Sequence, residues 1–255
     1  MHYKSIFISD FHLGTKGCQA DALCNFLKHN TCDNLFLVGD IIDGWRLSKS
    51  WYFPQNHVNT IRRIFTAAKR GTNVYYLLGN HDEAFRKFLS YDISIGNIKL
   101  LDRIDYIGVN GKRYLIIHGD FFDELMLSSK WLMHLGDNLY AFMIWFNTYF
   151  NRVRRYFNLP YWSLSNWLKQ NTKQALNFIH KFEKKVATYC KENHYDGVVC
   201  GHIHTAEIKI IEGIEYMNDG DWVESGSALV EHVDGTFELI YQKGLELDGK
   251  NITDN

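Results

Sequence analysis

Five short segments of the 255-residue sequence combine glycine with side chains that bind metal ions. In chain order they are Asp10-Phe11-His12, Gly39-Asp40, Gly79-Asn80-His81-Asp82, His118-Gly119-Asp120 and Gly201-His202-Ile203-His204. Carboxylate, amide and imidazole groups are ligands for divalent cations, and a carboxylate can bridge two cations about 3.5–4 Å apart. A turn or a solvent-exposed histidine would explain any single segment. The presence of all five favours a two-metal site.

Each of these segments follows a short apolar run that is typical of a buried β-strand. The five runs are residues 5–8, 35–38, 74–78, 114–117 and 197–200. Amphipathic helices are predicted for 21–29 and 58–69, and further strands for 206–211, 228–232 and 237–242. Alternation of strands and helices predicts an α/β layered core, in which the carboxyl ends of the strands share one edge. We therefore expect the five segments to lie together.

Charge is distributed unevenly along the chain. The formal net charge is −1, but residues 130–191 carry +8 and the other residues carry −9. Twelve aromatic residues lie between positions 131 and 167. Positive charge beside aromatic side chains predicts a surface that meets anionic and apolar groups together, as a phospholipid-like molecule would present them. A helical layer with buried aromatic side chains and solvated lysines is the alternative.

The same patterns predict the domain organisation. We expect a core made of residues 1–122 and 193–243, a helical insertion at 123–192, and a polar tail at 244–255. Hydrophobic content of 46% and charged content of 22% exclude disorder for most of the chain. The five cysteines form no C-x-x-C pair, so we expect free thiols. No secretory leader or membrane-spanning segment is expected, which favours a cytoplasmic location.

The five segments resemble the motifs of the calcineurin-like metallophosphoesterases, which are D-x-H, G-D, G-N-H-D/E, H-G and G-H-x-H. The resemblance covers roughly residues 5 to 205. It implies an α/β fold of the metallophosphoesterase type, a four-layer α/β/β/α sandwich in which helices flank two mixed β-sheets. It also implies two divalent metal ions, with manganese expected and iron or zinc as alternatives.

The resemblance assigns a role to each matching residue. It implies that the first metal is bound by Asp10, His12 and His204. It implies that the second is bound by Asn80, His118 and His202, and that Asp40 bridges the two. His81 corresponds to the catalytic histidine and Asp82 to the carboxylate expected to orient it. Such a site hydrolyses phosphoric esters, because two cations lower the pKa of a bound water and neutralise phosphoryl oxygens.

Within this superfamily the chain is similar to the UDP-2,3-diacylglucosamine hydrolase branch, on residues 39–45, 118–120 and the helical insertion. That branch splits a pyrophosphate in lipid A synthesis, usually with manganese, to give a lipid monosaccharide phosphate (lipid X) and UMP. The similarity implies an anionic nucleotide-lipid substrate and makes the insertion a candidate for peripheral contact with the inner face of the cytoplasmic membrane. Lys169 and Lys173, one helical turn apart, are candidate ligands for a substrate phosphate.

Two departures leave the substrate open. The characterised hydrolase has arginine at the position of His81, and Cys-Thr-Asp-Asp where this chain has residues 121–124. Another phosphodiester, such as a nucleotide, a phosphoprotein or another phospholipid-like molecule, is therefore the alternative substrate. A non-enzymatic scaffold is a further alternative, although all seven metal-binding residues are present. We expect no nucleic-acid partner, and the sequence indicates no obligate protein partner.

Overall fold

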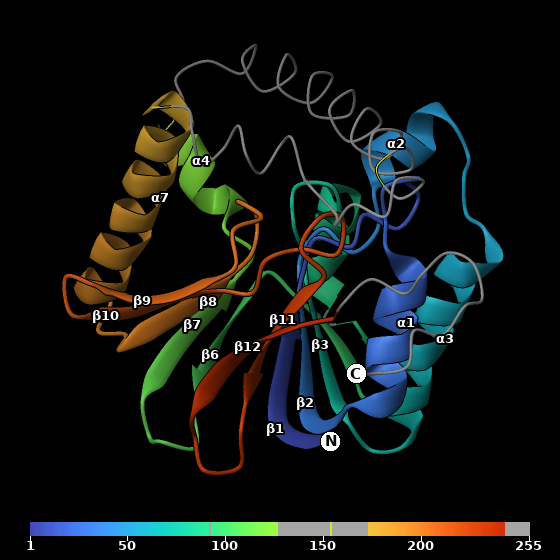
Figure 1. The fold of residues 1–255 in the computed structure, drawn as a ribbon, viewed down its shortest axis with the longest axis horizontal. Coiled ribbons are helices and arrows are strands. Elements are labelled where there is room, and N and C mark those ends of the chain that lie inside the picture. Colours follow the sequence, from blue (N-terminus) through green and yellow to red (C-terminus); the bar gives the residue numbers. More distant parts are fainter. Residues whose placement is uncertain (92, 127–153, 155–172, 243–255) are drawn as a thin grey trace.

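The computed structural model describes residues 1–91, 93–126, 154 and 173–242, and its strands form two β-sheets (Figure 1). The strands of the first sheet are β1 (His2–Ile8), β2 (Thr31–Val38), β3 (Asn73–Leu77), β4 (Ser94–Ile95), β5 (Ile98–Leu101), β11 (Ser227–Glu231) and β12 (Phe237–Tyr241). The strands of the second are β6 (Arg103–Ile107), β7 (Arg113–Ile117), β8 (Gly197–Cys200), β9 (Glu207–Ile211) and β10 (Ile214–Asn218).

Both sheets are mixed, with parallel strands at their centres. The strand order is β12-β11-β1-β2-β3-β5-β4 in the first sheet and β6-β7-β8-β10-β9 in the second. β1, β2, β3 and β5 run parallel to one another, and so do β7, β8 and β10. The outer strands pair antiparallel. The carboxyl ends of the parallel strands of each sheet therefore share one edge.

Helices cover the outer faces of both sheets. The helices of the described residues are α1 (Ala20–His29), α2 (Gly44–Lys49), α3 (Gln55–Lys69), the 3-10 helix η1 (Glu83–Tyr91), α4 (Asp120–Met126) and α7 (Lys173–Glu192), of which α2 and η1 bury no residue. In Figure 1, α1 and α3 lie on one side of the pair of sheets, and α4 and α7 lie on the other. The described helices contain no segment that is both long enough and apolar enough to cross a membrane.

Alternation of side chains along the strands explains the layers. On β2, Leu35 and Leu37 pack in the cluster that contains α1 and α3, whereas Phe36 and Val38 pack in the cluster between the sheets. On β8, Val198 and Cys200 pack with residues of α7 in the same way. Successive residues of a strand point to opposite faces, so each central strand serves two apolar layers. The predicted four-layer α/β/β/α fold is confirmed.

The predicted strands and helices of the described residues are confirmed, but several elements escaped prediction. β6 is half exposed and carries charged side chains, so it lacks the apolar run that marks a buried strand. α2 has six residues and no buried side chain, which leaves no apolar stripe to recognise. Every cysteine of the chain is a free thiol.

The helix α7 is part of the hydrophobic core. Its residues Phe182, Val186 and Cys190 are fully buried against the second sheet. The C-terminal part of the predicted 123–192 insertion therefore forms the outer layer of this sheet. Most of the insertion, with its predicted helix break at Leu159-Pro160, and the 244–255 tail lie outside the described residues. The division of the chain into core, insertion and tail stays a prediction.

We expect Phe182→Ala to lower the free energy of unfolding by about 3–5 kcal/mol, because it leaves a cavity in a packed layer. Phe178→Ala is the matched control on the same helix, since Phe178 is 38% exposed. Urea denaturation of both variants measures the difference. Equal stabilities would show that α7 does not pack on the second sheet.

Candidate metal centre

The ends of neighbouring parallel strands bring the five predicted segments together. In the first sheet Ile8 of β1 pairs with Leu37 of β2, and Val38 of β2 pairs with Leu77 of β3. The three strands therefore end almost level, just before the loops that carry Asp10, Asp40 and Asn80. β7 and β8 end level in the second sheet in the same way. The backbone N–H of Trp222 donates to the backbone carbonyl oxygen of Asp10 at 3.1 Å, which joins a further loop to this edge.

Five of the seven predicted metal ligands have left-handed backbone conformations. Their φ values are 52° at Asp10, 50° at His12, 53° at Asp40, 71° at His202 and 51° at His204. Such conformations cost non-glycine residues of order 1–3 kcal/mol each and concentrate at functional sites. Hydrogen bonds hold them in place, since the backbone N–H groups of Asp10 and His12 donate to the carbonyls of Gly39 and Asp40, each at 3.0 Å. The loops are thus shaped to aim these side chains.

The first group of predicted ligands surrounds Asp10. His204 Nε2 lies 2.9 Å from Asp10 Oδ1, and His12 Nε2 lies 3.8 Å from the same oxygen. One ligand atom from each of these three residues falls within 4.8 Å of the others. His12 Nε2 is buried and has no hydrogen-bond partner among the described residues. The predicted ligands of the first metal are therefore close enough to bind one cation.

The second group surrounds Asp40. His118 Nε2 lies 3.4 Å from Asp40 Oδ2, and the rings of His118 and His202 are 5.0 Å apart. His118 Nε2 and Asn80 Oδ1 are buried without a hydrogen-bond partner in the described part of the chain. Asp40 Oδ2 also lies 3.8 Å from His12 Nε2. Asp40 therefore lies between the two groups, as a bridging ligand must.

The electrostatics of the site fit divalent cations. Burial would raise the pKa of both Asp10 and Asp40, but nearby histidines, His204 for Asp10 and His118 for both, hold these pKa values below the usual range. Burial would lower the pKa of His118, but Asp40 and Asp10 raise it well above its ordinary value. Two buried carboxylates with unpartnered imidazole and amide atoms beside them match the donor set of a two-metal site.

Two glycines permit the close approach of the ligand loops. A Cβ atom on Gly79 would lie 2.2 Å from Asp40 Oδ1, and one on Gly201 would lie 2.5 Å from Asp10 Oδ2. Real Cβ atoms do not make such contacts. These glycines are therefore required because backbone packs directly against the two carboxylates.

Asp43 is a functional residue that the sequence reasoning missed. Its Oδ2 lies 3.3 Å from Nδ1 of His12, and its Oδ1 lies 3.1 Å from Nδ1 of His81. Burial would raise the pKa of Asp43, but the two histidines hold it below the usual range. His81 Nε2 lies 3.9 Å from Asp40 Oδ2, so its ring joins Asp43 to the metal site. The spacing Gly39-Asp40-x-x-Asp43 is the signal that could have revealed it.

The structure gives Asp82 other contacts than the expected one. Its carboxylate accepts hydrogen bonds from the Ile41 and Ile42 N–H groups at 2.9 Å each and from the Tyr76 hydroxyl at 3.0 Å. Burial and then the charge of Asp40 raise the pKa of Asp82 to about 7. Asp82 thus fixes the loop that follows Asp40. The carboxylate that contacts the His81 ring is that of Asp43.

Two further residues flank the site. His202 Nε2 lies 2.5 Å from Asp123 Oδ2, a contact that the sequence did not predict. The Trp45 ring lies 4.3 Å from the His81 ring, and Trp45 Nε1 donates to Glu83 Oε1 at 2.9 Å. Lys169 and the side chain of Lys173, the candidate phosphate ligands, lie outside the described residues.

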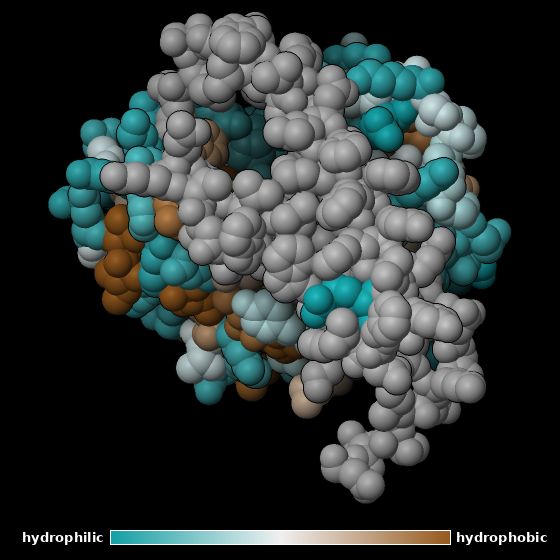
Figure 2. Space-filling model, turned by 45° about the horizontal axis from the view of Figure 1, so that its top comes forward, coloured by the Kyte–Doolittle hydropathy of each residue, from teal (hydrophilic) through white to brown (hydrophobic). Residues whose placement is uncertain are grey.

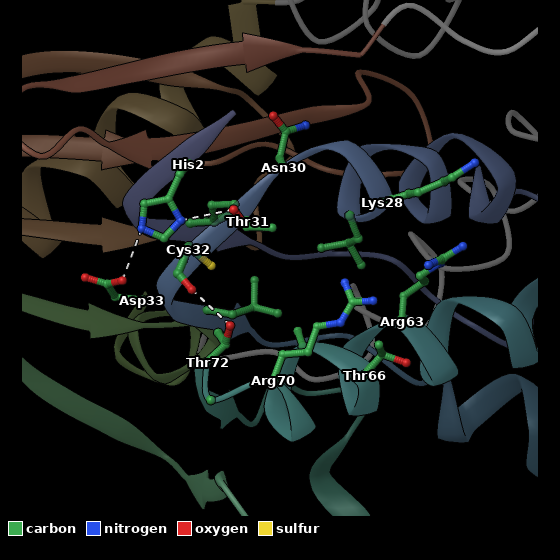
Figure 3. Close-up of a pocket in the computed structure, with 15 residues that line it drawn as sticks. His2, Lys28, Asn30, Thr31, Cys32, Asp33, Arg63, Thr66, Arg70 and Thr72 are labelled. Atoms are coloured by element: carbon green, nitrogen blue, oxygen red, sulfur yellow. Dashed lines mark hydrogen bonds and ion pairs between the residues drawn. The ribbon is translucent and has the colours of Figure 1, made fainter.

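A cavity of about 300 Å³ lies at the opposite edge of the first sheet, between α1 and α3 (Figure 3). Lys28, Arg63 and Arg70 line it, and no described carboxylate forms an ion pair with them. Lys28 in the last turn of α1 and Arg70 at the C-cap of α3 stand where basic side chains offset the negative end of the helix dipole, whereas Arg63 lies in the middle of α3. This cavity is far from the ligand loops and takes no part in the metal centre.

We expect Asp43→Asn to lower kcat for a chromogenic phosphodiester by about 10–100-fold, because the charge that orients His12 and His81 is lost. Asparagine is also a good N-cap, so α2, which Asp43 caps through the Arg46 N–H, is retained. Metal analysis, steady-state kinetics and thermal unfolding separate these effects. Asp234→Asn, in an exposed turn, is the control. A kcat within twofold of wild type would contradict the role of Asp43.

Comparisons with known proteins find several chains to which this one is similar. The UDP-2,3-diacylglucosamine hydrolase of Shewanella sp. (strain ANA-3) is 22% identical over 236 residues, which are 91% of this chain and 95% of that protein. The DNA polymerase II small subunit of Methanothermobacter thermautotrophicus is 27% identical over 171 residues, 54% of this chain but only 35% of that protein. A solved archaeal phosphodiesterase has a TM-score of 0.43 at 12% identity, covering 93% of this chain and 98% of that one.

The family comparison covers all five ligand segments. The model of the calcineurin-like phosphoesterases matches residues 3–206, which extend from β1 to the loop that carries His204. The matched region contains every residue of the two groups around Asp10 and Asp40. The chain belongs to the calcineurin-like phosphoesterase family.

Proposed function

We propose that this chain is a di-metal hydrolase that cleaves the pyrophosphate bond of UDP-2,3-diacylglucosamine. The products would be 2,3-diacylglucosamine 1-phosphate (lipid X) and UMP, a step of lipid A biosynthesis. The observation that carries the hydrolase is the pair of ligand groups around Asp10 and Asp40, with His81 beside them. The Shewanella protein supports this choice of substrate, because it is named UDP-2,3-diacylglucosamine hydrolase and the match with this chain spans 95% of its length.

The residues of the chain divide the work of hydrolysis. Asp10, His12 and His204 would hold one cation, Asn80, His118 and His202 the other, and Asp40 both. When bound, such cations lower the pKa of water and offset the negative charge of phosphoryl oxygens. His81 Nδ1 lies 3.1 Å from Asp43 Oδ1, and its Nε2 lies 3.9 Å from Asp40 Oδ2, so the ring stands between Asp43 and the metal site. A His81 ring protonated on both nitrogens can give its Nε2 proton to the departing oxygen and remain as the neutral imidazole.

Apolar side chains near the site support a substrate with acyl chains. Phe85 and Phe88 of η1 are 37% and 36% exposed, and Phe121 of α4 is 40% exposed. η1 begins directly after Asp82 and α4 directly after Gly119, so both helices leave from ligand loops. In Figure 2, where the top of Figure 1 comes forward, the hydrophobic areas that can be seen lie mainly at the left and lower margin of the view, among hydrophilic ones. Exposed aromatic side chains beside a phosphate-binding site suit a phospholipid-like substrate.

This chain has histidine at position 81, where the characterised hydrolase has arginine. Hydrolysis of another phosphodiester is therefore a second candidate function. Arginine would bind a phosphate through two parallel hydrogen bonds, whereas histidine can transfer a proton. The contact of His81 with Asp43 favours proton transfer at this position. Metal identity, membrane contact through the insertion, a cytoplasmic location and the absence of a nucleic-acid partner stay predictions. The basic, aromatic residues that suggested membrane contact lie mostly outside the described part of the chain.

We expect the protein with added Mn²⁺ to release UMP from detergent-solubilised UDP-2,3-diacylglucosamine, and EDTA to abolish the release. Asp40→Ala is the inactive control, because both metals lose a ligand. Parallel assays with Fe²⁺, Zn²⁺ and bis(p-nitrophenyl) phosphate define the metal and the substrate. Strong cleavage of the simple diester without cleavage of the nucleotide-lipid would favour the second candidate.

We expect Phe88→Ser to raise KM for the acylated substrate about fivefold, because roughly half of a phenylalanine burial energy of about 2 kcal/mol is lost. KM for the chain-free diester should stay at the wild-type value. Ile107→Ser is the matched control, since Ile107 is 60% exposed at the far end of β6. Equal changes in KM for both substrates would argue against acyl-chain contact at η1.

A further inference from the structure

We propose that Asp123, on α4, orients His202 for binding the second metal, and so connects the start of the insertion to the metal centre. Asp123 Oδ2 lies 2.5 Å from His202 Nε2. Both side chains are largely buried, with 16% and 14% of their surfaces exposed. The inference rests on the di-metal site of the proposed function but not on the identity of the substrate.

The hydrogen bond decides which nitrogen of His202 is available to a metal. An ionised carboxylate can only accept hydrogen bonds, so His202 Nε2 must carry the proton that it donates to Asp123. The lone pair of the neutral ring is then on Nδ1. In metal sites, a carboxylate on one ring nitrogen fixes the tautomer and raises the basicity of the other nitrogen. Asp123 therefore prepares Nδ1 of His202 as the ligand atom.

Two other histidines of the site, His118 and His12, are held on the same principle. His118 donates Nδ1–H to the Val38 carbonyl oxygen at 2.8 Å, which leaves Nε2 facing Asp40. His12 has Nδ1 at 3.3 Å from Asp43, which leaves its buried Nε2 without a hydrogen-bond partner in the described residues. A backbone carbonyl orients the first ring and a carboxylate the second. Asp123 completes the set for His202.

Packing of α4 fixes the position of Asp123. The neighbouring Phe122 is fully buried and packs edge to face against Phe182 and Tyr189 of α7, at 6.1 and 5.4 Å between ring centroids. The Phe182 ring also lies 6.0 Å from the His202 ring. One aromatic cluster thus places both the carboxylate and the imidazole. An alanine at position 123 would leave that packing intact.

The backbone of His202 is anchored separately from its ring. Its N–H donates to Asp10 Oδ2 at 3.0 Å, so the loop does not depend on Asp123 for its position. Loss of the Asp123 carboxylate should therefore change the orientation and tautomer of the ring rather than the fold. Asp123 is the first residue of the predicted 123–192 insertion and lies within α4, so the arrangement of the insertion's first turn is coupled to metal affinity.

Metal titration tests the proposal. We expect Asp123→Ala to weaken the second of two Mn²⁺ binding steps by about 10–100-fold, leaving the first within twofold. Asp123→Asn keeps an acceptor oxygen for the Nε2–H and should recover most of the lost affinity. Asp33→Ala is the matched control, because it removes the carboxylate of an exposed His2–Asp33 pair remote from the site. It should leave both binding steps unchanged.

A spectroscopic measurement gives an independent answer. In the metal-free wild-type protein, ¹⁵N shifts of the His202 ring should report protonation at Nε2, and Asp123→Ala should lose this single tautomer. Protonation at Nδ1 in the wild type would overturn the proposal, as would two binding steps unchanged by Asp123→Ala. A wild-type protein that binds no metal would instead refute the di-metal function itself. The wild-type spectrum decides the question even if a variant fails to fold.

Discussion

The burial of two carboxylates at one edge of a sandwich is the constraint on which the rest of this structure depends. Asp10 and Asp40 are 0% and 2% exposed, and both keep pKa values below the usual range despite that burial. Burying a charge is costly unless opposite charge or a metal compensates it. Histidines around the pair supply part of the compensation. The Nε2 atoms of His12 and His118, which have no hydrogen-bond partner among the described residues, mark where cations would supply the rest. Strand ends, left-handed loops and glycines all serve this one arrangement.

The site also depends on the orientation of its imidazole rings. Each ring has two nitrogens, and only one can carry the lone pair that a metal needs. The Val38 carbonyl selects this nitrogen for His118, and carboxylates perform the task for His12 and His202. These orienting groups come from β2, the loop before α2, and α4. Two of these elements, β2 and α4, contain no predicted ligand, so groups outside the ligand loops also orient the rings.

The sequence predicts the fold and the ligands for the same physical reason. Apolar runs identify buried strands, and parallel strands that end level bring the residues after them to one edge, so Asp10 and His118 can be assigned without coordinates. Asp43 and Asp123 resist this reasoning because their partners are set by loop conformation and helix packing. Asp82 illustrates the difference, since adjacency to His81 suggested a contact that the loop geometry gives to Asp43. Local order along the chain does not determine which carboxylate meets which ring.

Chemistry and substrate preference are encoded in adjacent but separate parts of the chain. The predicted ligands lie in the loops at the strand ends, whereas α2, η1 and α4 begin two to four residues after one of them and carry the side chains proposed to meet the rest of a substrate. Trp45 on α2 and His81 in a ligand loop lie between these two parts, with their ring centroids 4.3 Å apart. A change of the His81 side chain leaves in place its backbone N–H, which donates to Asp40 Oδ1 at 2.9 Å. A family can therefore keep one metal centre and vary its substrates, which is why the ligand set identifies the reaction more firmly than the molecule hydrolysed.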